Sequence, residues 1–324
     1  MKLIFVTHHI GGGKNKQHYE DKGIEFEYLI LPDVVRKYRF LSKRGIIWRE
    51  FKALIKLLLN IHKIRGSKVY SIGGQYGCMF IFRIFGPLLG KDSHLYIHNF
   101  YLHNLGKHNK VKKVLRFLMN GKNMTLIVQT PGEEEYYRNI SDKIDIRFVP
   151  YCMDYFPNSV PDEGYIFTGG YTNRDYNIMA ELSNKMTDEN FVFVMSQLNG
   201  NVPLPRNVKV YKDIPGEEFQ RLLVRSKMVI VPLKDDVGSS GQMLCLQSMR
   251  SAKPIVYSDV SSINYYFTPT SGYPYKIGDI TSLYRAVKDA LANTILNAGS
   301  NAYEESLKYT KEKEQEMIDA ILGI

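Results

Sequence analysis

The chain has 324 residues, which is long for one hydrophobic core and sufficient for two domains. No segment approaches 18 uninterrupted apolar residues, so the sequence does not predict a membrane-spanning helix. Its opening, MKLIFVTHH, predicts a first strand and lacks the features of a signal peptide. The three cysteines, Cys78, Cys152 and Cys245, are far apart and form no metal motif, which favours a reducing cytosol without disulfides.

The net charge of +10 is unevenly distributed along the chain. Residues 1–150 contain 26 Lys and Arg against 12 Asp and Glu, a charge of +14, whereas residues 151–324 carry −4. We therefore expect an anionic partner for the first half: a membrane surface, nucleic acid or a phosphorylated substrate. A basic surface that only keeps the protein soluble is the alternative.

Strands alternate with helices along the first half. We predict strands at KLIFVTHH, FEYLILP, KVYSIGG, HLYIHN, MTLIVQT and IRFVP. Helical periodicity marks residues 46–64, and further helices are predicted at YGCMFIFRIFG, VKKVLRFLMN and PGEEEYYRNI. In the last of these, Pro in the first turn followed by acidic residues suits the positive end of a helix.

The second half repeats this alternation. We predict strands at YIFTGG, FVFVMSQ, VKVYKDI, MVIVPL, KPIVYSD and YPYKIGD, and helices at PGEEFQRLLVRS, QMLCLQSMRS and TSLYRAVKDALAN. A last helix is predicted at about 303–322. The segment 151–164 contains two prolines and is predicted to link the two halves.

The alternation predicts an α/β protein with two Rossmann-like, doubly wound domains that face each other across a cleft. We place the N-terminal domain at 1–153 and the C-terminal domain at 154–302. A C-terminal helix, able to cross back to the N-terminal domain, is placed at 303–324. Ligands of open α/β sheets collect at the carboxyl ends of the strands, beside helix N-termini, so the cleft is the expected site.

The loop GSSGQ stands between a predicted strand and a predicted helix. Gly238 and Gly241 allow close approach of the backbone, and Ser239 and Ser240 add hydroxyl donors. Free N–H groups at the start of a helix are what a phosphate group binds. A simple helix cap would explain the same residue types.

A second glycine loop, HHIGGGKNK at 8–16, follows the first strand and contains Gly12 and Gly13. It matches neither GxGxxG nor the P-loop pattern. Substrate binding at this loop is one interpretation, and a flexible turn is the other.

These segments, in this order, resemble the retaining glycosyltransferases with the GT-B fold, of the broad family-4 type, over nearly the whole chain. MKLIFVTHH…GGG resembles the opening strand and glycine loop, LYIHN the strand that ends in a histidine, and LIVQTPGEEEYY the end of the acceptor domain. VPYCMDYFPN resembles the crossover between domains. YIFTGGYTNRDYNIMAEL, DIPGEEFQRLLVRSKMVIVPL and the SSGQ…LQSMRSAKPIVYSD run resemble the nucleotide-sugar domain.

The chain departs from this family at a pair of glutamates that lie eight residues apart. When the Lys-Pro pair that begins the predicted strand KPIVYSD is aligned with the family, the two glutamate positions fall on Ser239 and Gln247. Gln247 can still accept and donate hydrogen bonds to a nucleotide ribose. Ser239 is too short to replace a glutamate that faces the sugar, which leaves the donor sugar open.

The resemblance implies a donor of the UDP- or GDP-sugar type, with no cofactor and no metal. Gly12, Gly13, Ser239, Gln242 and Gln247 are assigned to binding. The diphosphate would lie on the N–H groups of Ser240 and Gly241 and on the guanidinium of Arg174, since fixed dipoles and a planar fork stabilise the charge that develops on the departing nucleotide. The alternative for Arg174 is a solvated residue paired with Asp175. The sequence contains no Asp-x-Asp, which argues against a metal-dependent transferase.

His98 ends a predicted strand of the first half, where the family places a histidine next to the reacting sugar. We assign it the catalytic role of hydrogen bonding and orientation near the anomeric carbon. A buried structural histidine is the alternative.

Two basic segments lie in the first half, at 36–63 and 107–116. One face of the predicted helix 46–64 collects apolar residues, namely Ile47, Phe51, Leu54, Leu58 and Ile61. Basic amphipathic segments suit an anionic lipid surface, whereas the alternative is a core-facing helix with a solvated basic face. Nucleic-acid binding is not expected, because no helix-turn-helix or RNP-like string is present.

We therefore predict a cytoplasmic hexosyltransferase, peripheral on the inner face of the plasma membrane. It would transfer sugar with retention to a hydroxyl of a surface glycan, expected to be lipid-linked. A nucleotide-sugar 2-epimerase on the same fold and a non-catalytic partner subunit are the alternatives.

Overall fold

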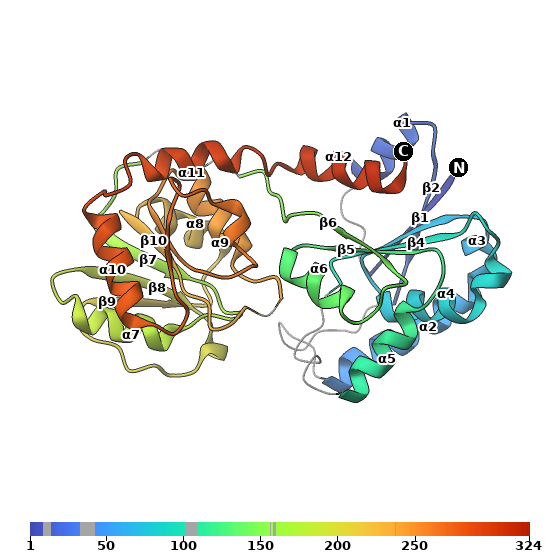
Figure 1. Ribbon diagram of the computed structural model, residues 1–324, viewed down its shortest axis with the longest axis horizontal. Coiled ribbons are helices and arrows are strands. Elements are labelled where there is room, and N and C mark those ends of the chain that lie inside the picture. The colour runs from blue at the N-terminus through green and yellow to red at the C-terminus, as the bar shows by residue number, and fades with distance from the viewer. Residues whose placement is uncertain (9–13, 33–42, 101–108, 156, 158–159, 237) are drawn as a thin grey trace. The chain divides into compact units, whose positions relative to one another are not determined.

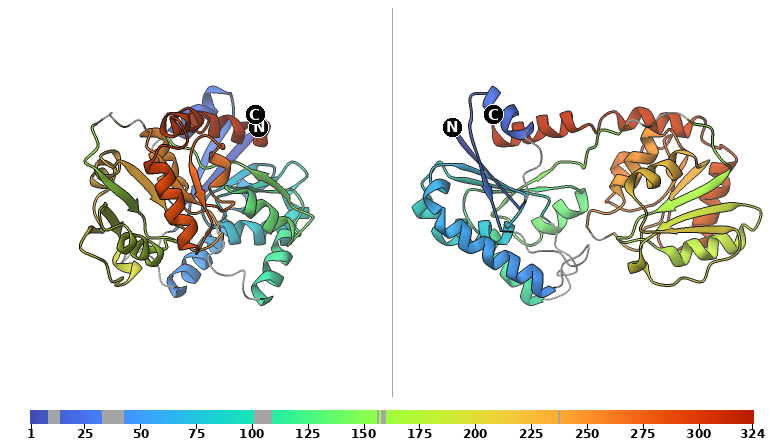
Figure 2. Two further views of the ribbon diagram at one scale, coloured as in Figure 1. Left: turned by 60° about the vertical axis from the view of Figure 1, so that its left-hand side comes forward. Right: turned by 180° about the vertical axis from the view of Figure 1, so that it is seen from behind.

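The computed structural model describes residues 1–8, 14–32, 43–100, 109–155, 157, 160–236 and 238–324. It contains two compact units, of which one comprises Met1–Val149 with Met317–Ile324 and the other Pro150–Glu316. Each unit has a six-stranded sheet with helices on both faces, as Figure 1 and the two views of Figure 2 show. The predicted fold class, an α/β protein with two Rossmann-like domains, is confirmed.

The sheet of the first unit has the strand order β2-β1-β3-β4-β5-β6, with every neighbouring pair parallel. Its strands are β1 (Lys2–Thr7), β2 (Glu25–Ile30), β3 (Lys68–Ser71), β4 (His94–His98), β5 (Met124–Val128) and β6 (Asp145–Phe148). Its helices are α1 (Lys14–Asp21), α2 (Lys43–Leu59), α3 (Ile61–Ile64), α4 (Gln75–Leu89), α5 (Asn109–Met119) and α6 (Pro131–Arg138). The central strands are nearly continuous apolar runs because both of their faces are covered.

The sheet of the second unit has the order β12-β11-β10-β7-β8-β9 and is also parallel throughout. Its strands are β7 (Tyr165–Gly169), β8 (Asn190–Met195), β9 (Val208–Lys212), β10 (Met228–Val231), β11 (Ile255–Ser258) and β12 (Tyr273–Tyr275). Its helices are α7 (Tyr176–Lys185), α8 (Gly216–Val224), α9 (Gln242–Arg250), α10 (Ile280–Leu291) and α11 (Ala298–Ser306), with short 3-10 turns η2 (Gln197–Asn199) and η3 (Asn264–Tyr266).

Each sheet separates two apolar layers. In the first unit, α2, α4 and α5 pack on one face through residues such as Leu57, Met79 and Leu115. In the second unit, alternate residues of β7 enter different layers, Phe167 the one with α8 and α9 and Ile166 the one with α7 and α10. Strand side chains alternate between faces, so each strand anchors both layers.

The last helix, α12 (Lys311–Leu322), ends in the first unit. Ile318 and Leu322 are buried in the layer that also contains Leu3 and Phe5. Asp319 is buried and accepts hydrogen bonds from His18 Nε2 at 2.8 Å and from Lys22 Nζ at 2.5 Å. These contacts fix the end of the chain against α1.

Three predicted helices differ from the structure. The helix expected at 46–64 is divided at Asn60 into α2 and α3. The single helix expected at 303–322 is divided into α11 and α12, because the Asp154 carboxylate accepts the Lys311 N–H at 3.1 Å and starts a new helix there. Helix α4 continues through Pro87 to Leu89, beyond the expected end.

Candidate functional site

The strand order of the second unit reverses between β7 and β10. The chain runs from β7 outward through β8 and β9, then returns to the other side of β7 at β10. The loops after β7 and β10 therefore leave their strands in opposite directions, and open α/β sheets bind ligands in the crevice at this switch point. The loop after β7 carries Arg174, and the loop after β10 carries the GSSGQ segment.

Backbone contacts hold these two loops together. Arg174 pairs with Leu233 in an isolated antiparallel bridge. The Asp175 N–H donates to Pro232 O at 2.9 Å, and Asn173 Nδ2 donates to Asp235 O at 3.0 Å. The structure thus brings together two predicted site segments that lie far apart in the sequence.

Arg174 is only 7% exposed, and its guanidinium is held by carbonyl groups. Nε donates to Gly169 O at 2.9 Å, and Nη1 donates to Thr172 O at 2.8 Å. Burial lowers the pKa of Arg174. In the described part of the chain no carboxylate forms an ion pair with it, and Asp175 instead caps α7 by accepting the Ile178 N–H at 3.1 Å. A buried cation without a counter-ion carries a desolvation cost that a bound anion would offset.

Gly170 makes room for this guanidinium. Its φ is +113°, and a Cβ there would lie 2.9 Å from both Nε and Nη2 of Arg174. Any other residue would be strained and would displace the arginine.

Gly241 is the N-cap residue of α9 and adopts a left-handed conformation, with φ +87°. A Cβ at this position would lie 3.2 Å from Leu233 and 3.3 Å from both Ile263 and Val231. As a glycine, Gly241 has no side chain that could cap the helix. The N-cap residue of α9 therefore leaves the positive end of this helix without a capping oxygen of its own, and the positive end of a helix is where anions bind.

Ser240, just before α9, and Gln247, in the second turn of α9, have unsatisfied polar atoms. They are 6% and 4% exposed. Within the described residues neither Ser240 Oγ nor Gln247 Oε1 has a hydrogen-bond partner. An unsatisfied buried polar atom costs about 1–3 kcal/mol, so each atom calls for a ligand or water.

The other predicted residues of this loop have different surroundings. Gln242 begins α9 and its Nε2 donates to Tyr265 Oη at 2.9 Å, so its side chain fixes the helix against η3. Ser239 is half-buried.

His98 lies at the carboxyl end of β4 in the first unit and is 5% exposed. Its Nδ1 is hydrogen-bonded to Tyr70 Oη, and its carbonyl accepts from Gln75 Nε2 at 2.6 Å. Tyr70 and Gln75 were not predicted, because nothing in the sequence shows that the neighbouring strand β3 and the start of α4 supply partners for the histidine.

The first glycine loop is only partly described. Gly12 and Gly13 lie outside the described residues. His8, at its beginning, bonds through Nδ1 to Pro32 O at 3.0 Å. A Cβ on Gly73 would lie 2.7 Å from His8 Cδ2, so β1 and β3 end in close contact at the switch point of this sheet.

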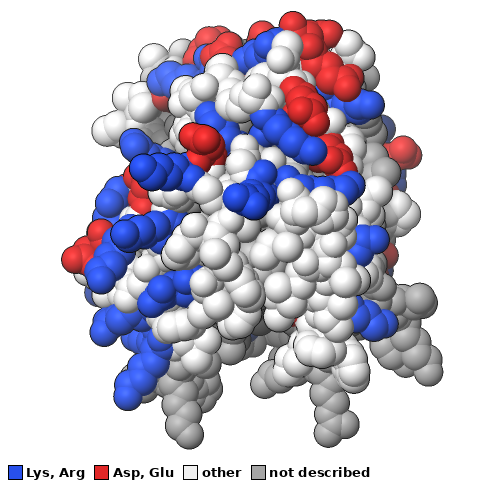
Figure 3. Space-filling view, turned by 90° about the vertical axis from the view of Figure 1, so that its right-hand side faces the viewer, with Lys and Arg blue, Asp and Glu red and all other residues white. Residues whose placement is uncertain are grey.

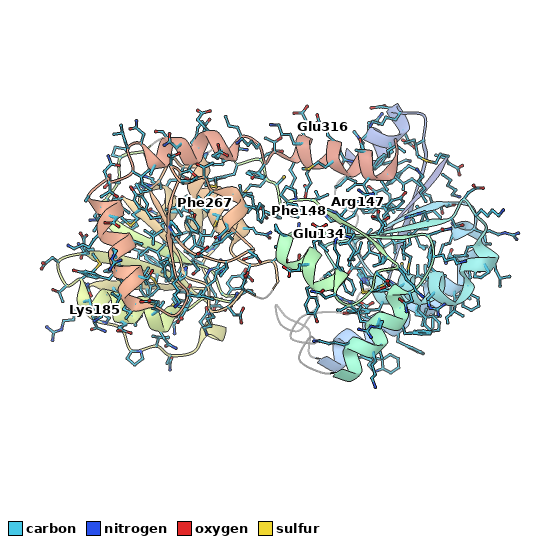
Figure 4. The ribbon with its side chains drawn as sticks, in the orientation of Figure 1. Glu134, Arg147, Phe148, Lys185, Phe267 and Glu316 are labelled. Carbon is cyan, nitrogen blue, oxygen red and sulfur yellow. The ribbon has the colours of Figure 1, made fainter. Side chains whose placement is uncertain are left out.

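A hollow of about 630 Å³ lies elsewhere in the second unit, along the edge strand β12. Its walls include Tyr257 and Phe267, whose rings stack at 3.9 Å, together with Gly272 and Asp289; Figure 4 labels Phe267. Neither Arg174 nor the start of α9 lines it. We base the candidate site on the switch point, where charge and unsatisfied polar atoms converge.

Comparisons with known proteins identify the fold. No protein-family model matches the chain. No curated protein is similar enough to count as a relative.

Many solved structures match nonetheless. Sucrose-phosphate synthase from Thermosynechococcus elongatus is 13% identical, has a TM-score of 0.69, and is matched over 99% of this chain and 98% of its own. HepE from Anabaena in complex with UDP is 12% identical, with a TM-score of 0.66 and full coverage of both chains. WaaG, a glycosyltransferase involved in lipopolysaccharide biosynthesis, is 12% identical, with a TM-score of 0.65 over 99% of this chain and 100% of its own. The chain therefore has the GT-B fold, as its sequence pattern predicted.

Proposed function

We propose that the protein is a glycosyltransferase that uses a nucleotide-diphosphate sugar as donor. The observation that carries this proposal is the buried Arg174, which no described carboxylate pairs and whose loop is bonded through the backbone to the loop before α9. The N-cap residue of α9 is Gly241, which has no side chain to cap the helix. A diphosphate would satisfy both, because a guanidinium forms a planar fork for phosphate oxygens and the helix start supplies N–H donors. That HepE has been crystallised with UDP supports a uridine nucleotide as the first candidate.

The same groups would assist the chemical step. Cleavage of the sugar–phosphate bond places negative charge on the departing nucleotide. Donors fixed in advance stabilise that charge without reorganisation, which commonly contributes several kcal/mol. The proposal needs no metal ion for this stabilisation, in keeping with the lack of Asp-x-Asp in the sequence.

The sugar and the acceptor would lie near residues assigned from the resemblance. We assign Gln247 to the nucleotide ribose, since Oε1 is buried without a described partner. His98 would orient the reacting sugar, because its imidazole is held in place by Tyr70. Retention at the anomeric carbon and a hexosyl donor follow from the family that the sequence resembles.

We further propose that the acceptor is a hydroxyl of a lipid-linked surface glycan and that the enzyme is cytoplasmic and peripheral to the membrane. The involvement of WaaG in lipopolysaccharide biosynthesis supports an acceptor of this kind. None of the described helices is long and apolar enough to cross a bilayer.

Donor hydrolysis tests the proposal. The protein is incubated with UDP- and GDP-sugars, with and without a chelator, and released sugar is followed by NMR, which also reports the anomer. We expect slow release of free sugar from one donor class, unaffected by chelation and lost in Arg174→Gln. Formation of an epimer would instead indicate an epimerase, and no turnover with any donor would indicate a non-catalytic subunit.

A further inference from the structure

Three helices on one face of the first sheet, α2, α4 and α5, expose many large apolar side chains. Their inner residues, such as Leu57, Met79 and Leu115, are buried in the core. Eleven apolar residues of the same helices are at least 36% exposed: Ile47, Trp48, Phe51, Ile55, Leu58, Leu59, Phe80, Ile84, Leu88, Val114 and Phe117. We call this set the apolar face. Soluble monomers rarely expose so many large apolar residues together without a binding role.

Helix α2 shows how the apolar face is separated from the core. At 100° per residue, its six exposed apolar residues fall within an arc of about 120°, from Ile47 to Leu59. Ala53 and Leu57, which are fully buried, lie on the opposite side. Lys52 and Lys56 fall just beyond the apolar arc and are exposed. The helix thus has one apolar side for the core and a second one for another partner.

Helices α4 and α5 extend this surface. Phe80, Ile84 and Leu88 recur every four residues and form one line along α4. Helix α4 packs closely on α2 at Gly77, where a Cβ would lie 3.1 Å from Leu57 Cδ1. The Arg83 guanidinium lies 4.9 Å from the centre of the Phe117 ring of α5. The exposed residues of the three helices therefore belong to neighbouring elements.

The charges on these helices are nearly all positive. Basic side chains beside the apolar face, all exposed or half-exposed, are Arg49, Lys52, Lys56, Arg83, Lys112, Lys113 and Arg116. Glu50 is the single acidic residue in the three helical sequences, and its side chain is only 18% exposed. Figure 3 shows the first unit from one side, with a broad uncharged area in its lower half between groups of Lys and Arg, and acidic side chains mostly above it.

We infer that the apolar face of α2, α4 and α5 is a membrane-docking surface, whose apolar side chains enter the interface of an anionic bilayer while the surrounding Lys and Arg contact its headgroups. An apolar strip bordered by cations is the pattern of helices that lie in a membrane surface, with apolar groups about 5–10 Å deep. Lys is depleted at protein–protein interfaces, so this composition favours a lipid partner over a second protein.

This inference deepens the proposed function, from which it takes the lipid-linked acceptor. It also changes the prediction made from charge alone, which placed the affinity in the segments 36–63 and 107–116. Helix α4 lies outside both segments and contributes three apolar residues. Binding should therefore combine a salt-sensitive electrostatic part with insertion that salt does not screen.

Trp48 provides a direct test, because it is the single tryptophan of the chain and is 59% exposed. Full-length protein is mixed with vesicles of phosphatidylglycerol and phosphatidylcholine or of phosphatidylcholine alone. With the anionic vesicles we expect tryptophan emission to shift to shorter wavelength and to be quenched by lipids brominated on their acyl chains. The neutral vesicles should produce little change.

Matched variants separate insertion from charge. Ile84→Ser with Leu88→Ser should reduce partitioning into anionic vesicles by about tenfold or more, whereas Leu296→Ser in the second unit, where Leu296 is 73% exposed, should not. Changing Lys112, Lys113 and Arg116 to Gln should reduce it by a similar factor at low salt. The same change at Lys185, Lys209 and Lys212, which are exposed in the second unit, is the control. All these positions are at the surface. Thermal melting should stay close to that of the unmodified protein, apart from a small decrease for the change at Arg116, whose Nε donates to Ile140 O at 2.9 Å.

Three results would overturn the inference. One is unchanged Trp48 emission with anionic vesicles at low salt. Another is equal vesicle binding by the Ile84→Ser/Leu88→Ser protein and its Leu296→Ser control. The third is a concentration-dependent emission shift without lipid, together with dimers in light scattering, since a second copy would then cover the apolar face. Donor hydrolysis does not require vesicles, so its persistence would show that only the docking surface is refuted.

Discussion

Replacing Gly241 with Ala perturbs the start of α9 without adding a polar group. A non-glycine residue in the left-handed region costs about 1–2 kcal/mol. The new Cβ would also lie 3.2–3.3 Å from three side-chain carbons, of Leu233, Ile263 and Val231. Such crowding adds about 1 kcal/mol or more. Because these neighbours belong to the core of the second unit, the backbone of residue 241 must shift, and its N–H must move with it.

Gly278→Ala is the matched control for backbone strain. Gly278 has φ +71° and lies in the same unit, and a Cβ at this position would have no described atom within 4 Å. Both variants should lower the melting temperature of this unit, Gly241→Ala by about 2–4 °C more, which corresponds to about 1 kcal/mol. Only Gly241→Ala should weaken nucleotide binding.

The expected loss of affinity follows from the hydrogen bonds at risk. A hydrogen bond to a charged group contributes about 1.5–3 kcal/mol, so disturbing one bond to the diphosphate should raise the Kd for UDP or GDP by about 10- to 100-fold. Isothermal titration calorimetry on the two folded variants measures this. A Kd for Gly241→Ala within about twofold of that for Gly278→Ala would refute the assignment of the α9 start to the diphosphate.

Three further predictions concern single side chains. Arg174→Gln should lower the affinity for a nucleoside diphosphate by at least about tenfold while leaving that for the nucleoside unchanged, as calorimetry with both ligands would show; equal losses would argue against a phosphate contact. His98→Ala should reduce sugar transfer far more than nucleotide binding, and an equal fall in both would indicate a structural histidine. Burial raises the pKa of Glu314, although Lys311 donates a hydrogen bond to its carboxyl group. The folded protein therefore favours the neutral form of this carboxyl group. The stability that the neutral carboxyl group contributes is present below its unfolded pKa of about 4.5 and is lost as pH rises through the folded pKa. Glu314→Gln should therefore raise the melting temperature more at about pH 8 than at about pH 4.5. An equal shift at both pH values would contradict this.

The fold was predictable because buried parallel strands are nearly continuous apolar runs, which are easily recognised in the sequence. Runs such as MVIVPL and KPIVYSD are apolar at nearly every position, since helices cover both faces of the sheet. Their alternation with helical periodicity then allows few topologies. The break between α11 and α12 was missed because its cause, the cap from Asp154 to Lys311, links residues far apart in the chain.

The candidate site was only partly predictable. Glycine and serine at the start of α9 and an arginine after β7 could be recognised as residue types. The sequence does not show that Arg174 is buried against main-chain carbonyl groups and has no carboxylate partner among the described residues. These features depend on tertiary packing, which no local sequence pattern encodes. The same holds for the Tyr70 bond to His98.

The sequence also could not show which side of α2 packs on the sheet. Its periodicity predicted one apolar face with Ile47, Phe51 and Leu58, and these three residues are exposed. The core contact is made mainly by Ala53 and Leu57, and of the predicted face only Leu54 and Ile61 pack against the core. A helix that is apolar over most of its circumference does not reveal which side packs on the sheet.

Hydrogen–deuterium exchange with and without saturating UDP or GDP tests the central claim most directly, because it reports on the backbone N–H groups assigned to the diphosphate. The account predicts that bound nucleotide slows exchange in peptides covering residues 239–246 and 169–175 of the second unit. The peptides around Lys185, at the end of α7, should be unaffected. Unchanged exchange at the start of α9 with every nucleotide, or protection confined to the first unit, would contradict it.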